Sequence, residues 1–163
     1  MSQKYNYQFN YPEGAKIEEA SKDAFSLSEE DKTAGKTFDS VFEEFTGKVC
    51  ISVTYKLGYI YITPKENAAF EHVQCGRSGR AYEGEDKTEN ITIEGKDYSA
   101  KGFEEKGPGE TLQYHNETYV LTTDSGLRIE YGAAPSTSST YADYLAQKAE
   151  LIKIVESVKS LSE

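Results

Sequence analysis

The chain has 163 residues and a formal net charge of −10, with 28 acidic and 18 basic residues. This length is enough for a single domain, residues 1–163, with its own hydrophobic core and no required cofactor. Because an acidic chain is repelled by phosphate backbones and anionic lipid surfaces, we do not expect nucleic acid or a membrane surface as a partner. The apolar runs are only a few residues long, so we expect no membrane-spanning segment.

The N-terminal residues 1–4 form a short polar lead before a strand-like segment. We interpret them as disordered residues, or as residues left where a start codon replaced a natural leader peptide and any lipid anchor that it carried. The chain contains 13 tyrosines and no tryptophan, which suits strands whose outer faces meet water. This composition predicts a secreted, periplasmic or cell-surface protein, which we expect to be monomeric.

The N-terminal third has one clear strand signal. Residues 5–11 alternate aromatic and polar side chains, the period that places Tyr5, Tyr7, Phe9 and Tyr11 on one face of a strand. Further short strands are predicted around Ile17 and at residues 24–27. Residues 38–45 fit either a helical stripe or a curled segment.

The middle of the chain predicts a series of hairpins. Residues 49–55 and 59–63 are rich in β-formers and are joined by a short connection that contains Gly58. Further predicted strands cover residues 91–93, 98–103, 112–114, 119–122 and 127–131, with turns at 94–97, 115–117 (containing His115) and 124–126. The charged residues 83–89 are predicted to form an exposed loop.

The C-terminal segment predicts an amphipathic helix. Residues 133–139 are small and polar and form a linker that ends in helix-cap residues. The helix is expected to begin at Tyr141 and to extend for about five turns. The predicted apolar side consists of Leu145, Ala149, Leu151, Ile152, Ile154, Val155, Val158 and Leu161. The predicted charged side consists of Lys148, Lys153, Glu156 and Lys159.

Two terminal motifs resemble those of a known group of proteins. The opening Tyr-x-Tyr-x-Phe-x-Tyr-Pro-x-Gly at residues 5–14 and the closing helix at residues 141–161 are similar to those of PsbP-like extracytoplasmic domains, which share their fold with photosystem PsbP and Ran-binding Mog proteins. The resemblance implies an α+β fold in which an antiparallel β-sheet of hairpins is covered by helices, the last being the C-terminal amphipathic helix. It also implies an accessory or binding role and transfers no catalytic residue.

Cys50 and Cys75 are the two cysteines of the chain. A disulfide between them would close a loop of roughly 25 residues and stabilise the fold by about 3 kcal/mol. The alternatives are two separate thiols, with Cys50 in the core and Cys75 exposed, or a reactive Cys75 thiolate beside His72. The phosphatase spacing Cys-x5-Arg is not met, because the sequence has Cys75-x4-Arg80.

Arg77 and Arg80 alternate with glycines after Cys75. This pattern suits either a small anion-binding nest or a solvated turn whose arginines pair with nearby acids. An acidic region within residues 23–44 lacks the spacing of a calcium-binding loop, and neither His72 nor His115 has a partner at zinc spacing, so we expect no metal site.

These observations predict a non-enzymatic accessory protein that contacts another protein. Tyr55, Tyr59 and Tyr61 are the candidate contact residues, because tyrosine offers rigid contact area, although ordinary sheet packing explains each of them as well. The alternatives are a carrier of a small anion or Ca²⁺ at the loop around Arg77 and Arg80, and a thiol enzyme that uses Cys75.

Overall fold

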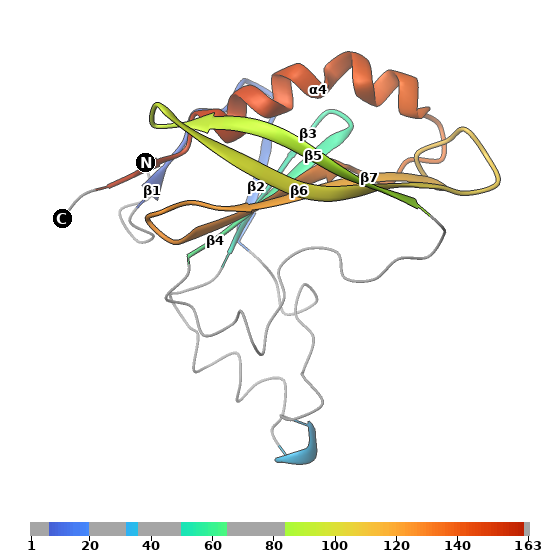
Figure 1. Cartoon of the computed structure of the whole chain (residues 1–163). Coiled ribbons are helices and arrows are strands. Elements are labelled where there is room, and N and C mark those ends of the chain that lie inside the picture. Colours follow the sequence, from blue (N-terminus) through green and yellow to red (C-terminus); the bar gives the residue numbers. More distant parts are fainter. Residues whose placement is uncertain (1–6, 20–31, 36–49, 65–83, 162–163) are drawn as a thin grey trace.

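The computed structural model describes residues 7–19, 32–35, 50–64 and 84–161 (Figure 1). Its elements, in chain order, are β1 (Tyr7–Gln8), β2 (Lys16–Glu19), β3 (Ile51–Tyr55), β4 (Gly58–Pro64), β5 (Gly84–Ile93), β6 (Lys96–Lys106), β7 (His115–Thr122), β8 (Leu127–Ala133), α4 (Tyr141–Glu156) and β9 (Lys159–Ser160). The segments predicted at residues 24–27 and 38–45 lie outside the described residues.

Most strands belong to one antiparallel sheet. Seven strands lie in the order β2-β3-β4-β8-β7-β6-β5, and β1 pairs with β9 in a separate two-stranded sheet. Every neighbouring pair is antiparallel. Figure 1 shows α4 lying across one face of the large sheet, where it lies closest to β4, β5 and β8 and also contacts β7 through side chains.

The predicted α+β class, a hairpin sheet covered by several helices, is wrong. The described residues are mostly strand, with the single long helix α4 and two antiparallel sheets. The physical reason is that only residues 141–156 in this part of the chain repeat apolar side chains at the helical period, whereas the rest alternate with the period of a strand.

Three of the predicted hairpins are confirmed. β3 pairs with β4, β5 pairs with β6, and β7 pairs with β8 across the predicted turn at residues 124–126. The β5–β6 turn has positive φ at Glu94 (52°) and Gly95 (76°). Positive φ at both central residues is the conformation of a type I′ two-residue hairpin loop. In the first hairpin, Lys56 adopts positive φ (51°), and Gly58 instead begins β4 with its Cα packed against Leu151 of the helix.

Three expectations for the middle of the chain are wrong. The exposed loop predicted at residues 83–89 is strand from Gly84 onward, because its charged side chains alternate and those of Lys87 and Glu89 turn toward the helix side. The strand predicted at residues 112–114 is a turn, and the predicted turn at His115 is the start of β7. Within this turn, Tyr114 N–H donates to the Thr111 carbonyl. Leu112 N–H donates to the carbonyl of Ser139, just before the helix.

The N-terminal strand is shorter than predicted. Among the described residues, only Tyr7–Gln8 form β1, and Tyr7 is buried whereas Tyr11 is 56% exposed. Tyr5 lies outside the described residues, and the rings of Tyr7, Phe9 and Tyr11 neighbour one another although only Tyr7 is buried.

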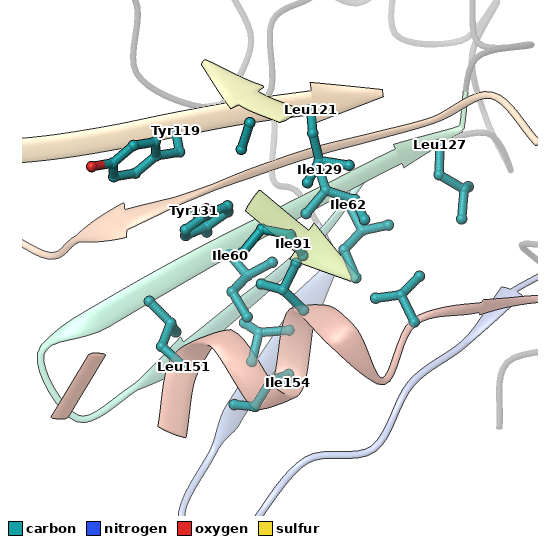
Figure 2. Packing of buried hydrophobic residues seen from close by; sticks show 14 of the residues in the cluster. Ile60, Ile62, Ile91, Tyr119, Leu121, Leu127, Ile129, Tyr131, Leu151 and Ile154 are labelled. Carbon is teal, nitrogen blue, oxygen red and sulfur yellow. The ribbon is translucent and has the colours of Figure 1, made fainter. Parts of the chain in front are cut away.

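The hydrophobic core lies between α4 and the sheet (Figure 2). The register places Ile60 opposite Tyr131 and Ile62 opposite Ile129, so that alternate residues of β4 and β8 face the helix. Leu151, Ile154 and Val155 of α4 pack against them, together with Ile91, Tyr119 and Leu121.

The helix begins where the sequence predicts. Thr140 is its N-cap: its hydroxyl accepts from Asp143 N–H, and the Asp143 carboxylate accepts from Thr140 N–H, which forms a capping box. The helix ends at Glu156, earlier than predicted, and Val158 is buried beyond its end. On the predicted apolar side, Leu145 is 46% exposed, whereas Tyr144 is buried.

Candidate functional site

Part of the interface between α4 and the sheet is polar rather than apolar. Lys148 contributes its ammonium group to an ion pair with Glu117 on β7 and to a second with Glu89 on β5 at 2.9 Å. Tyr141 donates its hydroxyl to Glu117, and Tyr131 donates its hydroxyl to Glu89 at 2.7 Å. Glu117 is only 2% exposed, so its charge depends on these partners.

The surroundings of this network fix its protonation. Burial opposes the charged form of Lys148, but the hydrogen bonds to Glu117 and Glu89 outweigh burial and raise the lysine pKa. Burial, followed by the hydrogen bonds to the carboxylates, raises the pKa values of Tyr131 and Tyr141. At neutral pH Lys148 is therefore protonated and both phenols are neutral, and their contacts with Glu117 and Glu89 hold the helix to the sheet.

A second cluster lies beside the first, around Glu104 of β6. Its carboxylate contacts Lys87 at 2.6 Å, His115 Nε2 at 3.0 Å and Lys106 at 3.4 Å. Burial disfavours ionisation of Glu104, but the hydrogen bonds from Lys87 and His115 and the nearby positive charges lower its pKa to about 2. The carboxylate is thus ionised at neutral pH and accepts a hydrogen bond from Nε2–H of His115.

The imidazole of His115 is held on two sides. Its ring stacks on that of Tyr141, with centroids 3.7 Å apart and planes inclined by 11°. Because Glu104 engages Nε2, the other nitrogen, Nδ1, is left without a hydrogen-bond partner among the described residues. In the neutral tautomer, Nδ1 is an acceptor.

Beside this imidazole lies an open cavity of about 590 Å³, which we call the His115 pocket. It is bounded by the β6–β7 connection, the start of α4 and His115. Its lining residues are Lys106, Gly107, Pro108, Gly109, Glu110, His115, Thr140, Tyr141 and Ala142.

Local structure explains this arrangement. The sheet register places Glu104 directly opposite Glu117, and both side chains face α4. Tyr141 N–H donates to the Glu110 carbonyl at 3.2 Å, which ties the β6–β7 connection to the first turn of the helix. The helix spacing 141, 144, 148 then carries Tyr141, Tyr144 and Lys148 along one side.

Sequence reasoning missed most of these residues. The sequence predicts Lys148 on the charged side of the helix, Glu89 in a loop and His115 in a turn, whereas the structure places Glu89 in β5, His115 in β7 and Lys148 against the sheet. The helical repeat does indicate that Lys148 faces the sheet, because it places Lys148 on the same side of the helix as Tyr144, Leu151 and Val155. These three residues are buried.

A second hollow lies at the other end of α4. This hollow, of about 500 Å³, we call the tyrosine groove, and it is lined by Asn10, Tyr11, Pro12, Tyr55, Glu150, Lys153 and Ile154. Asn10 N–H donates to Ser157 Oγ at 2.8 Å, and Ser157 Oγ–H also reaches the Asn10 carbonyl, so the segment that carries Tyr11 is tied to the end of the helix. Tyr55 donates its hydroxyl to Glu150 at 2.9 Å.

The three candidate contact tyrosines do not share one surface. Tyr55 lies on the helix side of the sheet, in the tyrosine groove. Tyr59 and Tyr61 occupy β4 positions that alternate with the buried Ile60 and Ile62, so they face the other side. Tyr59 is buried and lies 3.2 Å from Glu130 through its hydroxyl, and its ring packs 5.3 Å from that of Tyr61.

The predicted Cys-Gly-Arg loop lies outside the described residues. This applies to Cys75, Arg77, Arg80 and His72, so the disulfide, the anion nest and the reactive thiol all stay predictions. Cys50 is described and is fully buried at the start of β3.

No group of three or more His, Cys, Asp or Glu side chains is arranged to hold a metal ion among the described residues. Among the same residues, no helix has the length and apolar character needed to cross a bilayer.

Comparison with known proteins gives no match: no protein-family model, curated protein or solved structure is significantly similar to this chain. The PsbP-like resemblance therefore stays a prediction that depends on the two terminal motifs.

Proposed function

We propose that this protein is a non-enzymatic accessory domain that acts outside the cytoplasm and binds another protein through the tyrosine groove. The observation that carries the proposal is the position of Tyr11. This side chain is 56% exposed at the edge of a hollow whose other wall contains Tyr55. The tyrosine-rich composition and the PsbP-like resemblance support the same kind of role.

The groove has the features of a protein contact surface. Tyrosine supplies a large apolar ring with a polar tip and loses little conformational freedom on binding, which is why it is enriched at interfaces. Tyr11 is also supported by Phe9, whose ring lies 5.8 Å away. The groove is therefore bordered by preformed aromatic surface rather than by long mobile side chains.

The charges of the groove indicate the chemistry of its partner. Glu150 is already engaged by Tyr55 and by Lys56 at 2.7 Å, whereas Lys153 forms no ion pair among the described residues. A segment that places an apolar side chain between the two tyrosines and a carboxylate near Lys153 is complementary to this surface. We accordingly propose an extended protein segment with an apolar and an acidic residue as the occupant.

Affinity capture from the native host, followed by a binding measurement with the captured protein, tests the proposal. Tyr11→Ser is the test variant, and Leu145→Ser is the matched control, because Tyr11 and Leu145 are the large apolar side chains that are well exposed among the described residues. We expect the wild type and Leu145→Ser to bind equally, and Tyr11→Ser to bind roughly tenfold or more weakly, as for a hot-spot residue. Unchanged melting temperatures would show that both variants are folded.

Three results would contradict the proposal. They are undiminished binding by Tyr11→Ser, a selective loss with Leu145→Ser, and failure of the wild type to retain any protein specifically. A Lys153→Glu variant adds a test of the partner's charge, and it should weaken binding further at low ionic strength.

A further inference from the structure

The His115 pocket lies at the opposite end of α4 from the tyrosine groove and does not share a lining residue with it. We propose that this pocket binds a small, neutral, polyhydroxylated molecule, with saccharides as the representative class. The proposal is independent of the protein contact described above.

The His115 pocket offers both hydrogen-bond donors and hydrogen-bond acceptors. Lys106 contributes an ammonium group whose side chain is 70% exposed, and Glu110 contributes an exposed carboxylate. Nδ1 of His115 is an acceptor in the tautomer that Glu104 selects. A ligand hydroxyl can both donate and accept, so one type of group satisfies all of these positions.

The charges around the His115 pocket favour a neutral ligand. An anionic ligand near Lys106 would be repelled by Glu110 on the same wall and by Glu104 behind the imidazole. A cationic ligand near Glu110 would be repelled by Lys106, and the described residues contain no cluster of three metal-ligating side chains. A neutral ligand avoids both repulsions.

The imidazole of His115 is held in place before a ligand arrives. The imidazole is fixed by its hydrogen bond to Glu104 and by its stacking on Tyr141, whose hydroxyl is fixed in turn by Glu117. A group that is already oriented loses little freedom on binding. The remaining wall, which includes Pro108 and Ala142, provides apolar contact for the carbon skeleton of a sugar ring.

The test is a titration followed by amide chemical shifts, with maltose, N-acetylglucosamine, sodium sulfate and calcium chloride as separate probes. Ala142→Trp fills the pocket, and Ala146→Trp, one helical turn further along, is the matched control at another exposed position. We expect a saccharide to produce saturable shifts centred on Glu110, His115 and Ala142. Its affinity should fall at least tenfold in Ala142→Trp and stay unchanged in Ala146→Trp and in Tyr11→Ser.

The proposal is overturned if neither saccharide produces saturable shifts at these residues at millimolar concentrations. It is also overturned if sulfate or calcium saturates the site instead, or if Ala142→Trp binds the saccharide as tightly as the wild type. Retention of the wild-type amide spectrum outside the pocket verifies that each tryptophan variant is folded.

Discussion

Lys148 is the side chain that joins the helix to two carboxylates of the sheet. Its side chain is 13% exposed and that of Glu117 is 3% exposed, so this pair is largely removed from water. The net contribution of such a pair relative to apolar residues is small, but removal of one partner leaves a buried charge unpaired. The lysine therefore has a much larger effect on stability than its assignment to the charged side of a helix predicts.

Replacement of this lysine tests the point. We expect Lys148→Met to lower the free energy of unfolding by about 3 kcal/mol, because the buried Glu117 then loses its ammonium partner. Urea denaturation measures the change. The control, Lys153→Met at an exposed position of the same helix, should shift stability by no more than about 0.5 kcal/mol. Equal effects of the two substitutions would be inconsistent with the buried network.

The lowered pKa of Glu104 predicts how the stability of the protein changes at acid pH. Its pKa is about 2 in the folded protein, below its ordinary value of 4.5. A depressed carboxyl pKa contributes stability that is fully present above the ordinary value and is lost as the pH falls through the folded value. The shift corresponds to at most about 3 kcal/mol.

The wild type should therefore lose stability from about pH 5 down to about pH 2, and Glu104→Gln should show a shallower loss over the same range. Denaturant melts at several pH values measure both slopes, with Glu156→Gln as the exposed control on α4. If the wild type and Glu104→Gln have parallel profiles, the cations around Glu104 do not stabilise its charge.

At the level of elements, two glycines allow close approach to β7 on its two sides. A Cβ at Gly132 of β8 would overlap the carbonyl oxygen of Glu117, and a Cβ at Gly102 of β6 would overlap that of Thr118. These contacts are with backbone, which cannot turn away as a side chain can. The positions of Glu117 and Thr118 thus depend on glycine in both neighbouring strands.

Gly132→Ala should consequently destabilise the protein by roughly 2 kcal/mol or more, since the strands must separate locally to admit the methyl group. Thr122→Ala, at an exposed position of β7, is the control and should change stability by about 0.5 kcal/mol or less. Thermal and urea unfolding measure the two variants. A neutral Gly132→Ala variant would mean that β7 and β8 are not this close.

The elements that could be predicted from the sequence are those with a complete local signal. The β5–β6 turn has Gly95 where positive φ is required, and α4 has its capping box and its apolar repeat. The N-terminal half of β5 was missed because its strand alternation consists of charged residues, which have a low preference for strands and resemble a loop.

The candidate sites were harder to predict than the elements. Tyr55 is predicted as a contact residue and lines the tyrosine groove, but Tyr11, Lys153 and the His115 pocket are not predicted as sites. Each site combines residues from distant parts of the chain, such as Glu104 with His115 and Tyr141. Their proximity depends on the strand order and on the docking of the helix, neither of which is encoded by local spacing.

At the scale of the whole molecule, the predicted disulfide is open to a direct check. We expect Cys50 and Cys75 to resist alkylation in protein produced under oxidising conditions, and both to react after reduction and unfolding. Intact mass before and after reduction measures this. Alkylation of two thiols in the unfolded, unreduced protein would rule the disulfide out.

Both proposed binding surfaces depend on the docking of α4. The start of the helix contributes Thr140, Tyr141 and Ala142 to the His115 pocket, and its last turns contribute Glu150, Lys153 and Ile154 to the tyrosine groove. Lys148 attaches the helix to the sheet through the charge network. Leu151 and Val155 attach it through the hydrophobic core. The two surfaces are therefore present only while this packing is intact.

Native-state hydrogen exchange of the backbone amides tests this dependence most directly. The amide protons of Leu151, Ile154 and Val155 should exchange with the same free energy as those of Ile60 and Ile129 in the central strands, and this value should equal the global free energy of unfolding. Exchange from α4 at a markedly lower free energy, while the central strands stay protected, would show that the helix opens independently and would contradict the account.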